Sequence, residues 1–368
     1  MINEFKLEEY LAKYEFSAPH LLCCSDSESW SMHEIIGMAS EDDLKLWNNL
    51  KLNYTEDQGL PELRETIARL DFPNLDKNNI LCFAGAEEGI FCALSAVLSK
   101  DDHAIVLTPC YQSLAEVPKF RGAKVTEIEL LEKNNWQIDI EAIKNAIKQN
   151  TKILIINFPH NPTGQVISPD EQKDLVTLLH KHNLWLFSDE VYRLIGKPTD
   201  GWAETAANTY EKAISLGVMS KAYGMPGLRI GWIASQNKEI LDKARKIKHY
   251  TTICNSSPAE IISLIALNNR DQILDRNNQI IESNIKLLDN FFEKNQNIFS
   301  WIRPQGGCVG FVNYLGKNQI DDFCNELITK QGVLLLPASA YSYNSQHFRV
   351  GFGRKNMPIA LEKLEQFI

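Results

Sequence analysis

The chain has little that would direct it to a membrane or to nucleic acid. No apolar run approaches the roughly 18 residues that a membrane-spanning helix needs. The first ten residues resemble an amphipathic helix and lack the basic and then apolar pattern of a signal peptide. Acidic residues outnumber basic ones, 47 to 38, and no basic stripe occurs. We therefore expect a cytoplasmic protein with no membrane or nucleic-acid partner.

Metal-ligand and disulfide patterns are also missing. None of the eight cysteines belongs to a Cys-x-x-Cys motif, and Cys23 and Cys24 are adjacent. Four others lie in or beside apolar runs: Cys82, Cys92, Cys110 and Cys254. His180 and His182 flank a lysine at a spacing that places them on different faces of a helix. We expect buried free thiols in a reducing compartment and no metal site.

Internal repeats, low-complexity linkers and the dinucleotide motif Gly-x-Gly-x-x-Gly are absent as well. At 368 residues the chain can bury a large core and divide into two domains. From about residue 60 to 235, helical segments alternate with short apolar strands, which indicates an α/β fold with a mainly parallel sheet between helices. We predict helices at 61–68 and 88–98, and strands at 103–107, 152–157 and 184–188.

The pattern changes after Ser257-Pro258. The sequence is strongly helical as far as Lys294 and then contains strand-like pieces at 311–313, 333–336 and 347–351. This change predicts a smaller α+β domain that the N-terminal residues join. We therefore predict an N-terminal segment at 1–45, a large domain at 46–250 and a small domain at 251–368.

Candidate polar groups follow directly on three predicted strands. They are Tyr111 in Pro109-Cys110-Tyr111, the segment from Asn157 to Gly164, and Asp189. Ligands in open α/β sheets bind outside the carboxyl ends of the strands. The sequence therefore predicts a site at this edge of the sheet.

An anion site is also predicted where Gly85-Ala86-Glu87 joins a strand to a helix. The backbone N–H groups of Ala86 and Glu87 at the helix start would meet an anion, helped by the helix dipole. A glycine before a helix is by itself most often a plain turn, so the other segments must support this prediction.

Lys221 begins the segment Lys221-Ala222-Tyr223-Gly224-Met225-Pro226-Gly227-Leu228-Arg229. A lysine amine can form a Schiff base with an aldehyde, and Arg229 can hold a phosphate on the same compound. A lone Ser-Lys pair would be an ordinary surface feature. The whole string resembles the lysine segment of the class I/II aminotransferases, which are fold type I enzymes that use pyridoxal 5'-phosphate (PLP).

The resemblance extends from about Tyr54 to Arg349 and implies roles for the predicted residues. Asp189 would pair with the ring nitrogen, because a protonated ring draws electrons from the substrate α-carbon. Tyr192 and Asn161 would contact the phenolic oxygen. The other implied contacts, to the ring face and the phosphate, are Tyr111, Gly85, Ala86, Glu87, Ser220 and Arg229.

The resemblance also implies a substrate clamp and a partner subunit. Arg349 interrupts an apolar strand, where a guanidinium either pairs with a structural carboxylate or receives one from a ligand. The family uses the matching arginine to bind the α-carboxylate of an amino acid, so the resemblance implies Arg349 and Asn161 as the substrate-binding residues. Tyr54 resembles the tyrosine that reaches the phosphate of the neighbouring subunit, which implies a homodimer with shared active sites. Lys221, Asp189 and Tyr192 would be the catalytic residues.

Three positions depart from the family pattern. Val218 stands where Ser or Gly is usual, so Ser215, Ser220 or a neighbour would supply that phosphate contact. The segment 22–29 replaces a glycine-bearing stretch that often closes over the substrate. Thr252 stands where aspartate-specific members carry an arginine, which argues against a dicarboxylate substrate.

The leading interpretation is an aminotransferase that moves an amino group from an α-amino acid to a 2-oxo acid through a Lys221 Schiff base. The segments 215–221 and 250–256 also resemble the capreomycidine synthases, PLP enzymes that cyclise an arginine derivative, so a PLP lyase or cyclase is the alternative. A third class, PLP-binding transcription regulators, adds a basic helix-turn-helix domain, and the acidic stretch before Tyr54 is too short for one.

Overall fold

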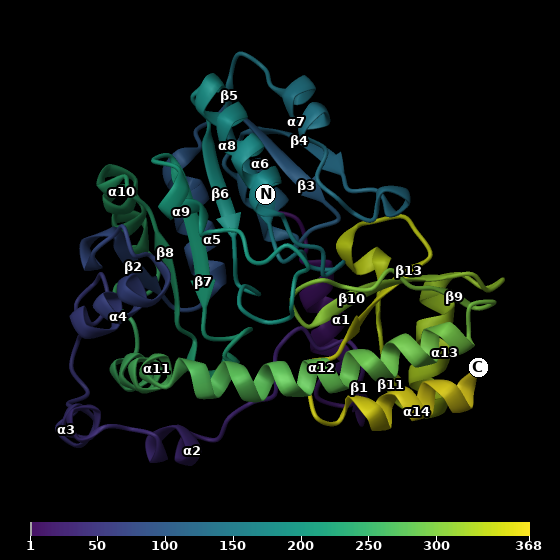
Figure 1. Ribbon diagram of the computed structural model, residues 1–368. Helices are drawn as coiled ribbons and strands as arrows, with labels where there is room; N and C mark the ends of the chain where they lie inside the picture. Colours follow the sequence, from purple (N-terminus) through teal and green to yellow (C-terminus); the bar gives the residue numbers. More distant parts are fainter. Residues whose placement is uncertain (1) are drawn as a thin grey trace.

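A seven-stranded sheet forms the larger part of the computed structural model, which describes residues 2–368 (Figure 1). Its strand order is β2-β8-β7-β6-β5-β3-β4, and all neighbours are parallel except β8, which is antiparallel to both β2 and β7. The strands are β2 (Ile80–Phe83), β3 (His103–Thr108), β4 (Lys124–Glu129), β5 (Thr151–Asn157), β6 (Trp185–Asp189), β7 (Ala213–Val218) and β8 (Gly231–Ala234). The predicted α/β fold with a mainly parallel sheet is confirmed.

Both faces of this sheet are buried, because successive side chains of a strand point to opposite faces and helices cover each face. Ile153 and Ile155 of β5 belong to the core cluster that also contains residues of α5 and α10, whereas Leu154 and Ile156 belong to the cluster that contains residues of α7 and α8. This is why the predicted strands read as continuous apolar runs. The helices of this part are α4 (Pro61–Asp71), α5 (Ala86–Val97), α6 (Ser113–Phe120), α7 (Ile140–Ala146), α8 (Pro169–His182), α9 (Ala206–Thr209) and α10 (Lys238–Lys248).

A second, antiparallel sheet has the order β12-β13-β10-β9. The predicted strand at 333–336 is in fact two strands, because β12 joins this sheet while β11 pairs in parallel with β1 from the N-terminal segment. The strands are β1 (His20–Leu21), β9 (Phe299–Ser300), β10 (Val309–Tyr314), β11 (Val333–Leu334), β12 (Leu336–Pro337) and β13 (His347–Gly351).

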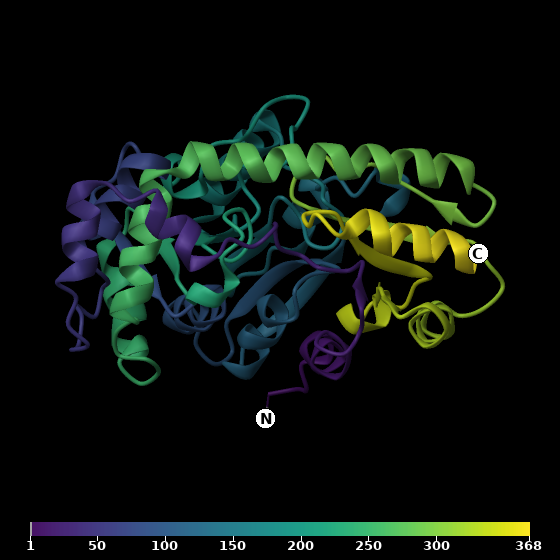
Figure 2. The same cartoon turned by 90° about the horizontal axis from the view of Figure 1, so that it is seen from below.

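The long helix α12 runs beneath both sheets. It extends from the part of the molecule that contains the large sheet to the part that contains the small one (Figures 1 and 2). The helices outside the large sheet are α1 (Lys6–Tyr14), α2 (Met32–Gly37), α3 (Glu41–Asn48), α11 (Ser257–Asn268), α12 (Arg270–Lys294), α13 (Ile320–Gln331) and α14 (Met357–Phe367). Short 3-10 turns complete the fold at η1 (Lys77–Asn79), η2 (Glu132–Asn134), η3 (Pro226–Leu228) and η4 (Ala338–Tyr341). The domain limits at residues 45 and 250 stay a prediction.

The cysteines follow the expected pattern with one exception. Seven are buried and free, but Cys254 is only half-buried, because it lies in the loop between α10 and α11. His180 and His182 lie in the last turn of α8, as expected of a solvated helix end. No helix within residues 2–368 has the length and apolar character that crossing a membrane requires.

Candidate active site

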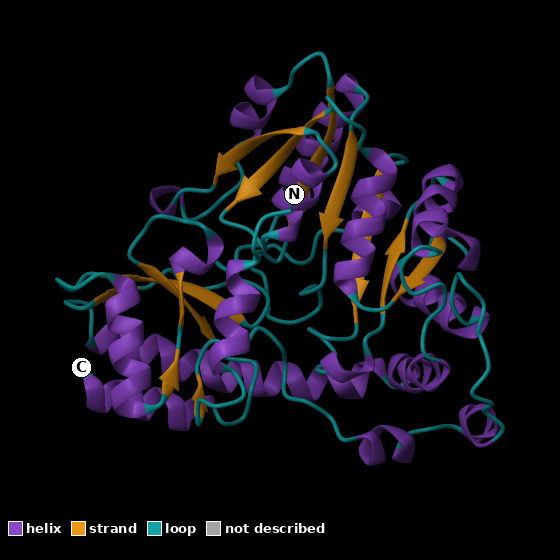
Figure 3. Ribbon diagram, turned by 180° about the vertical axis from the view of Figure 1, so that it is seen from behind, coloured by secondary structure: helices purple, strands orange, loops and turns teal. Residues whose placement is uncertain are grey.

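A cavity of about 660 Å³ lies at the carboxyl ends of β5 and β6. The loops that follow these strands lead toward the smaller sheet (Figures 1 and 3). Residues from the N-terminal segment, α5, the loop after β7 and β13 complete its wall. Ten of the residues predicted from the sequence line it: Ala86, Glu87, Tyr111, Asn161, Asp189, Tyr192, Ser220, Lys221, Arg229 and Arg349. The structure therefore brings most of the predicted site together.

The anion-binding end of the cavity is built from Gly85 and Arg229. Gly85 precedes α5 with a φ of 88°, a backbone conformation that favours glycine. A Cβ at this position would collide with the Arg229 guanidinium, so glycine is required for the arginine to lie over the turn. The helix start and the guanidinium together could hold a phosphate.

Ser220 lines the cavity together with Val218 and can supply the phosphate contact that is missing there. Ser215 is excluded as a phosphate ligand. It is fully buried in β7, where its hydroxyl donates to Glu190 Oε1 at 2.9 Å and accepts from Ala207 N at 2.9 Å.

Glu87 at the same end carries less negative charge than a free glutamate at neutral pH. Burial raises its pKa to about 7, and the hydroxyl of Ser113 donates to Glu87 Oε2 at 3.0 Å. Partial protonation would weaken its repulsion of a bound phosphate. Tyr111 nearby donates to Glu8 Oε1 at 2.8 Å.

Asp189 lies on the cavity wall where β6 ends, and it is 4% exposed. Burial raises its pKa to about 7, although the N–H of Val191 donates to its Oδ1 at 3.2 Å. It forms no ion pair within residues 2–368. A protonated ring nitrogen is the kind of cation that would offset this cost.

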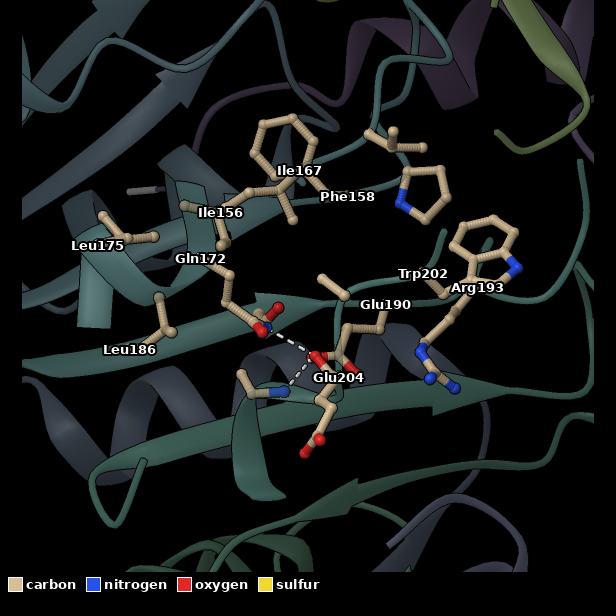
Figure 4. Close-up of a pocket in the computed structure, with 15 residues that line it drawn as sticks. Ile156, Phe158, Ile167, Gln172, Leu175, Leu186, Glu190, Arg193, Trp202 and Glu204 are labelled. Atoms are coloured by element: carbon tan, nitrogen blue, oxygen red, sulfur yellow. Dashed lines mark hydrogen bonds between the residues drawn. The ribbon is translucent and has the colours of Figure 1, made fainter. Parts of the chain in front are cut away.

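The neighbouring carboxylate Glu190 faces a different space. It lines a small cavity of about 30 Å³ that also contains Arg193 and Trp202 (Figure 4). Its Oε1 accepts from Ala206 N at 2.8 Å. This cavity has room for about one water molecule. Of the two adjacent carboxylates, only Asp189 can reach a ligand in the large cavity.

Tyr192 and Asn161 contribute further polar groups to the cavity wall. The Tyr192 hydroxyl is buried and has no hydrogen-bond partner among the described residues. A buried orphan hydroxyl is costly unless a ligand pairs with it. Asn161 is held by three bonds: its N–H donates to Asn157 Oδ1 at 2.8 Å, and its Oδ1 accepts from the Tyr341 hydroxyl at 2.8 Å and from Arg349 Nη1 at 3.3 Å.

Lys221 lies within the cavity, and burial lowers the pKa of its amine. A lower pKa increases the neutral fraction, which is the nucleophilic form. The Nζ atom donates to Ser25 Oγ at 2.9 Å.

Arg349 is a buried cation with no carboxylate partner in the described part of the chain. It is 2% exposed, and its guanidinium donates to the carbonyl of Cys23 at 3.0 and 2.8 Å and to the Tyr341 hydroxyl at 2.7 Å. Of the two possibilities open from the sequence, the structural carboxylate is therefore excluded. A ligand carboxylate can fill this role.

The predicted contact Tyr54 lies elsewhere, as does Thr252, which stands where aspartate-specific members carry an arginine. Tyr54 is 85% exposed and outside the cavity of its own chain. Thr252 is also outside, and its N–H and hydroxyl donate to Glu88 Oε1 at 3.2 and 2.7 Å. Neither can reach a ligand in this cavity without a second subunit.

Sequence reasoning missed several residues of the cavity wall. Ser25 and Asp26 enter from the N-terminal segment, Arg354 from the turn after β13, and Glu8 and Glu15 from α1 and its end. The departure of segment 22–29 from the family pattern was a signal for Ser25 and Asp26 alone. A short sequence motif cannot show which residues, some 300 positions away, it will contact in the folded chain.

These residues fit PLP. The Tyr192 hydroxyl and the Asp189 carboxylate both lack a partner that the ring would supply, and Gly85 leaves space for Arg229 over an anion site. Lys221 lies in the same cavity as an amine for the aldehyde group.

Comparison with known proteins agrees with PLP as the cofactor. The family model "Aminotransferase class I and II" matches residues 38–364. The chain is 26% identical to an aspartate aminotransferase of Bacillus subtilis over 91% of this chain and 92% of that enzyme. It is 25% identical to the capreomycidine synthase of Streptomyces vinaceus over 73% and 68% of the two chains. A PLP-dependent aminotransferase from Streptococcus suis has a TM-score of 0.93 at 31% identity, covering 100% of this chain and 97% of that one. The chain belongs to the class I and II aminotransferase family.

Proposed function

We propose that the protein is a PLP-dependent aminotransferase that transfers the amino group of an α-amino acid to a 2-oxo acid. One observation carries this proposal. A single cavity contains an amine with a lowered pKa, a buried carboxylate without a cation, and a buried guanidinium without a carboxylate: Lys221, Asp189 and Arg349. Each lacks the partner that PLP or an amino acid would provide.

The residues have separate tasks in this reaction. Bound PLP supplies the electron sink that makes the substrate α-proton removable. Lys221 would hold PLP, and its amine would carry that proton. Asp189 would keep a proton on the ring nitrogen, and Tyr192 would donate to the phenolic oxygen. Arg349 fixes the substrate carboxylate and thereby directs the α-proton toward Lys221.

The charges of the cavity disfavour a dicarboxylate substrate. Arg354 is the remaining cation of the wall, and Asp26 already neutralises it through two bonds of 3.0 and 2.8 Å. Thr252 supplies no positive charge, and its hydroxyl donates a hydrogen bond to Glu88. A second substrate carboxylate would therefore be desolvated without a counter-ion.

A second candidate function is a PLP cyclase or lyase that acts on an amino acid with a cationic side chain. Glu8 and Glu15 line the cavity, and neither forms an ion pair among residues 2–368. Carboxylates placed there would favour a cationic side chain over an anionic one. The similarity to a capreomycidine synthase supports the same candidate.

Mass spectrometry of the bound cofactor distinguishes the two functions. The holoenzyme would receive single additions from an amino-acid panel that includes arginine and hydroxyarginine. Conversion to pyridoxamine phosphate with release of a keto acid establishes transamination and names the donor. Retention of PLP beside a cyclised or eliminated product moves the assignment to the second candidate. Absence of PLP from the protein, even after reconstitution, would overturn both.

Replacing Arg349 by alanine should raise the KM for an α-amino acid by a factor equivalent to about 2–5 kcal/mol, because a desolvated charge pair is lost. Steady-state kinetics with the donor identified above measures this. Arg69→Ala, on the exposed face of α4, is the matched control and should leave KM unchanged. An unaltered KM in Arg349→Ala would point to an amine substrate without a carboxylate.

We also propose a homodimer with shared active sites. Leu52, Tyr54, Tyr250 and Ile253 are exposed hydrophobic residues. Their two loops lie side by side, because Thr55 Oγ1 donates to Asn255 O at 3.3 Å. A patch of this kind fits burial against a second copy of the chain. Sedimentation equilibrium should give a dimer, and a monomer at micromolar concentration would contradict the proposal.

A further inference from the structure

Residues 22–28, here called the N-terminal strap, contact both the substrate clamp and the lysine. At one end, the carbonyl of Cys23 accepts two bonds from Arg349, and Gly351 N donates to Leu22 O at 2.8 Å. At the other end, Ser25 Oγ accepts from Lys221 Nζ at 2.9 Å, and Ser27 N donates to Lys221 O at 3.3 Å. The strap therefore touches the side chain and the main chain of the same lysine.

The strap is held in place by a buried ion pair and by close packing. Asp26 is 6% exposed and binds Arg354 Nε and Nη2 through its two oxygens at 3.0 and 2.8 Å. Glu28 N donates to Gly353 O at 2.8 Å. A Cβ on Gly353 would collide with the carbonyl of Asp26. The backbone of the strap therefore packs closely against the turn after β13.

We propose that Ser25 is a positioning residue for Lys221 and that the Asp26–Arg354 pair fixes its place. The inference rests on the proposed use of Lys221 as the PLP-binding lysine. The Ser25 hydroxyl accepts an N–H of the amine, which limits the rotation of a long, flexible side chain inside a large cavity. The amine is thereby kept beside Arg349, where the substrate carboxylate would bind.

The electrostatic surroundings give the expected direction of the pH effect. Burial lowers the pKa of Lys221 and Arg349 lowers it further, whereas Asp26 opposes both. The charged and titratable groups that face the amine are Asp26 and Glu8 from the N-terminal region, Asp189 and Tyr192 from β6 and its loop, Cys308 before β10, and Arg349 from β13. A hydroxyl that accepts from the amine favours the charged form, so its removal lowers the pKa of Lys221.

The test follows covalent attachment of PLP to the full-length, cofactor-free protein between pH 6 and 10. In this step the amine nitrogen bonds to the aldehyde carbon and the aldehyde oxygen leaves as water. Borohydride trapping and peptide mass give the rate at Lys221. Ser25→Ala should lower the limiting rate at high pH about fivefold and move the midpoint of the profile to lower pH. Ser25→Thr, which keeps the hydroxyl, should restore both.

Further variants separate positioning from a structural role. Ser29→Ala, an exposed neighbour of the strap, should match the wild type. Asp26→Asn should also move the midpoint to lower pH, because it removes the carboxylate that opposes the lowered pKa of Lys221. In the holoenzyme, Ser25→Ala should lower kcat and leave the KM for the amino acid within about twofold, since Arg349 is untouched.

The outcomes distinguish the inference from the proposed function. A wild-type protein that forms no adduct at Lys221 would refute the proposed function itself. If the wild type forms the adduct and the pH profile of Ser25→Ala superimposes on the wild-type profile, the inference alone is refuted. A variant that binds less PLP with an unchanged midpoint and limiting rate would show a merely structural role for Ser25, and it too would overturn the inference. Circular dichroism confirms that the compared variants are folded.

Discussion

Lys221→Ala should lower turnover by about 10⁴-fold, because the variant loses both the attachment point for PLP and the base that moves the substrate α-proton. Some PLP should remain bound, since Arg229 and Asp189 keep their contacts with the phosphate and the ring. Single-turnover kinetics on the reconstituted variant, with cofactor occupancy measured by mass spectrometry, gives both quantities.

Lys181→Ala is the matched control. Lys181 is exposed on α8 and is not among the residues of the cavity wall, so its loss should change neither rate nor occupancy. A Lys221→Ala protein that turned over at the wild-type rate would remove the central residue from the proposed mechanism. A variant that lost PLP completely while remaining folded would show that Lys221 supplies most of the binding energy.

Asp189→Asn should reduce turnover by about 10²–10³-fold and reduce PLP occupancy far less. The amide keeps the size of the side chain but cannot stabilise a proton on the ring nitrogen as a carboxylate does, so the electron sink is weakened. Steady-state kinetics at saturating PLP measures the change. An unaltered rate would refute the role given to Asp189.

The same variant should change how the stability of the cofactor-free protein depends on pH. Burial raises the pKa of Asp189 to about 7 in the folded state, above the usual value of about 3.9 for an unfolded chain. Between these values the folded state holds a proton that the unfolded state has lost, so the stabilisation is present below about pH 4 and is lost as the pH rises through about 7. Asparagine has no such proton.

Thermal unfolding at pH 5 and pH 8 tests this linkage. The loss of stability at pH 8 should be smaller in Asp189→Asn than in the wild type. Adding PLP to the wild type should reverse the penalty at pH 8, because a protonated ring nitrogen pairs with the ionised carboxylate. Equal slopes in the two cofactor-free proteins would show that Asp189 does not carry this buried charge.

Much of the large sheet could be predicted because its strands are buried on both faces. Strands such as β5 therefore read as continuous apolar runs, and their polar neighbours Asn161 and Asp189 follow at the strand ends. The small sheet was less predictable. Val333 to Leu336 is one apolar run, yet it divides between two partners, β1 and β13, that lie far apart in the sequence.

Some residues of the candidate site could likewise be predicted from the sequence, and others could not. Residues of local motifs, such as Lys221 and Arg229, were found because each motif specifies its own turn. The contacts of Ser25 and Asp26 could not be found, because they depend on Lys221 and Arg354 meeting the N-terminal strap in space. Ser215 was proposed from its position near Lys221, but strand alternation directs it away from the cavity toward Glu190.

The N-terminal strap also has a consequence for the order in which the site is assembled. Asp26 and Arg354 are separated by 328 positions, so a ribosome adding about 5–20 residues per second needs roughly 16–66 s between them. Until then the strap has no strand to lie against, although the segments that bear Asp189 and Lys221 already exist. The nascent chain can therefore assemble the PLP-binding edge before the wall that Arg349 and the strap provide. The substrate pocket is therefore completed only after the C-terminal residues have been synthesised.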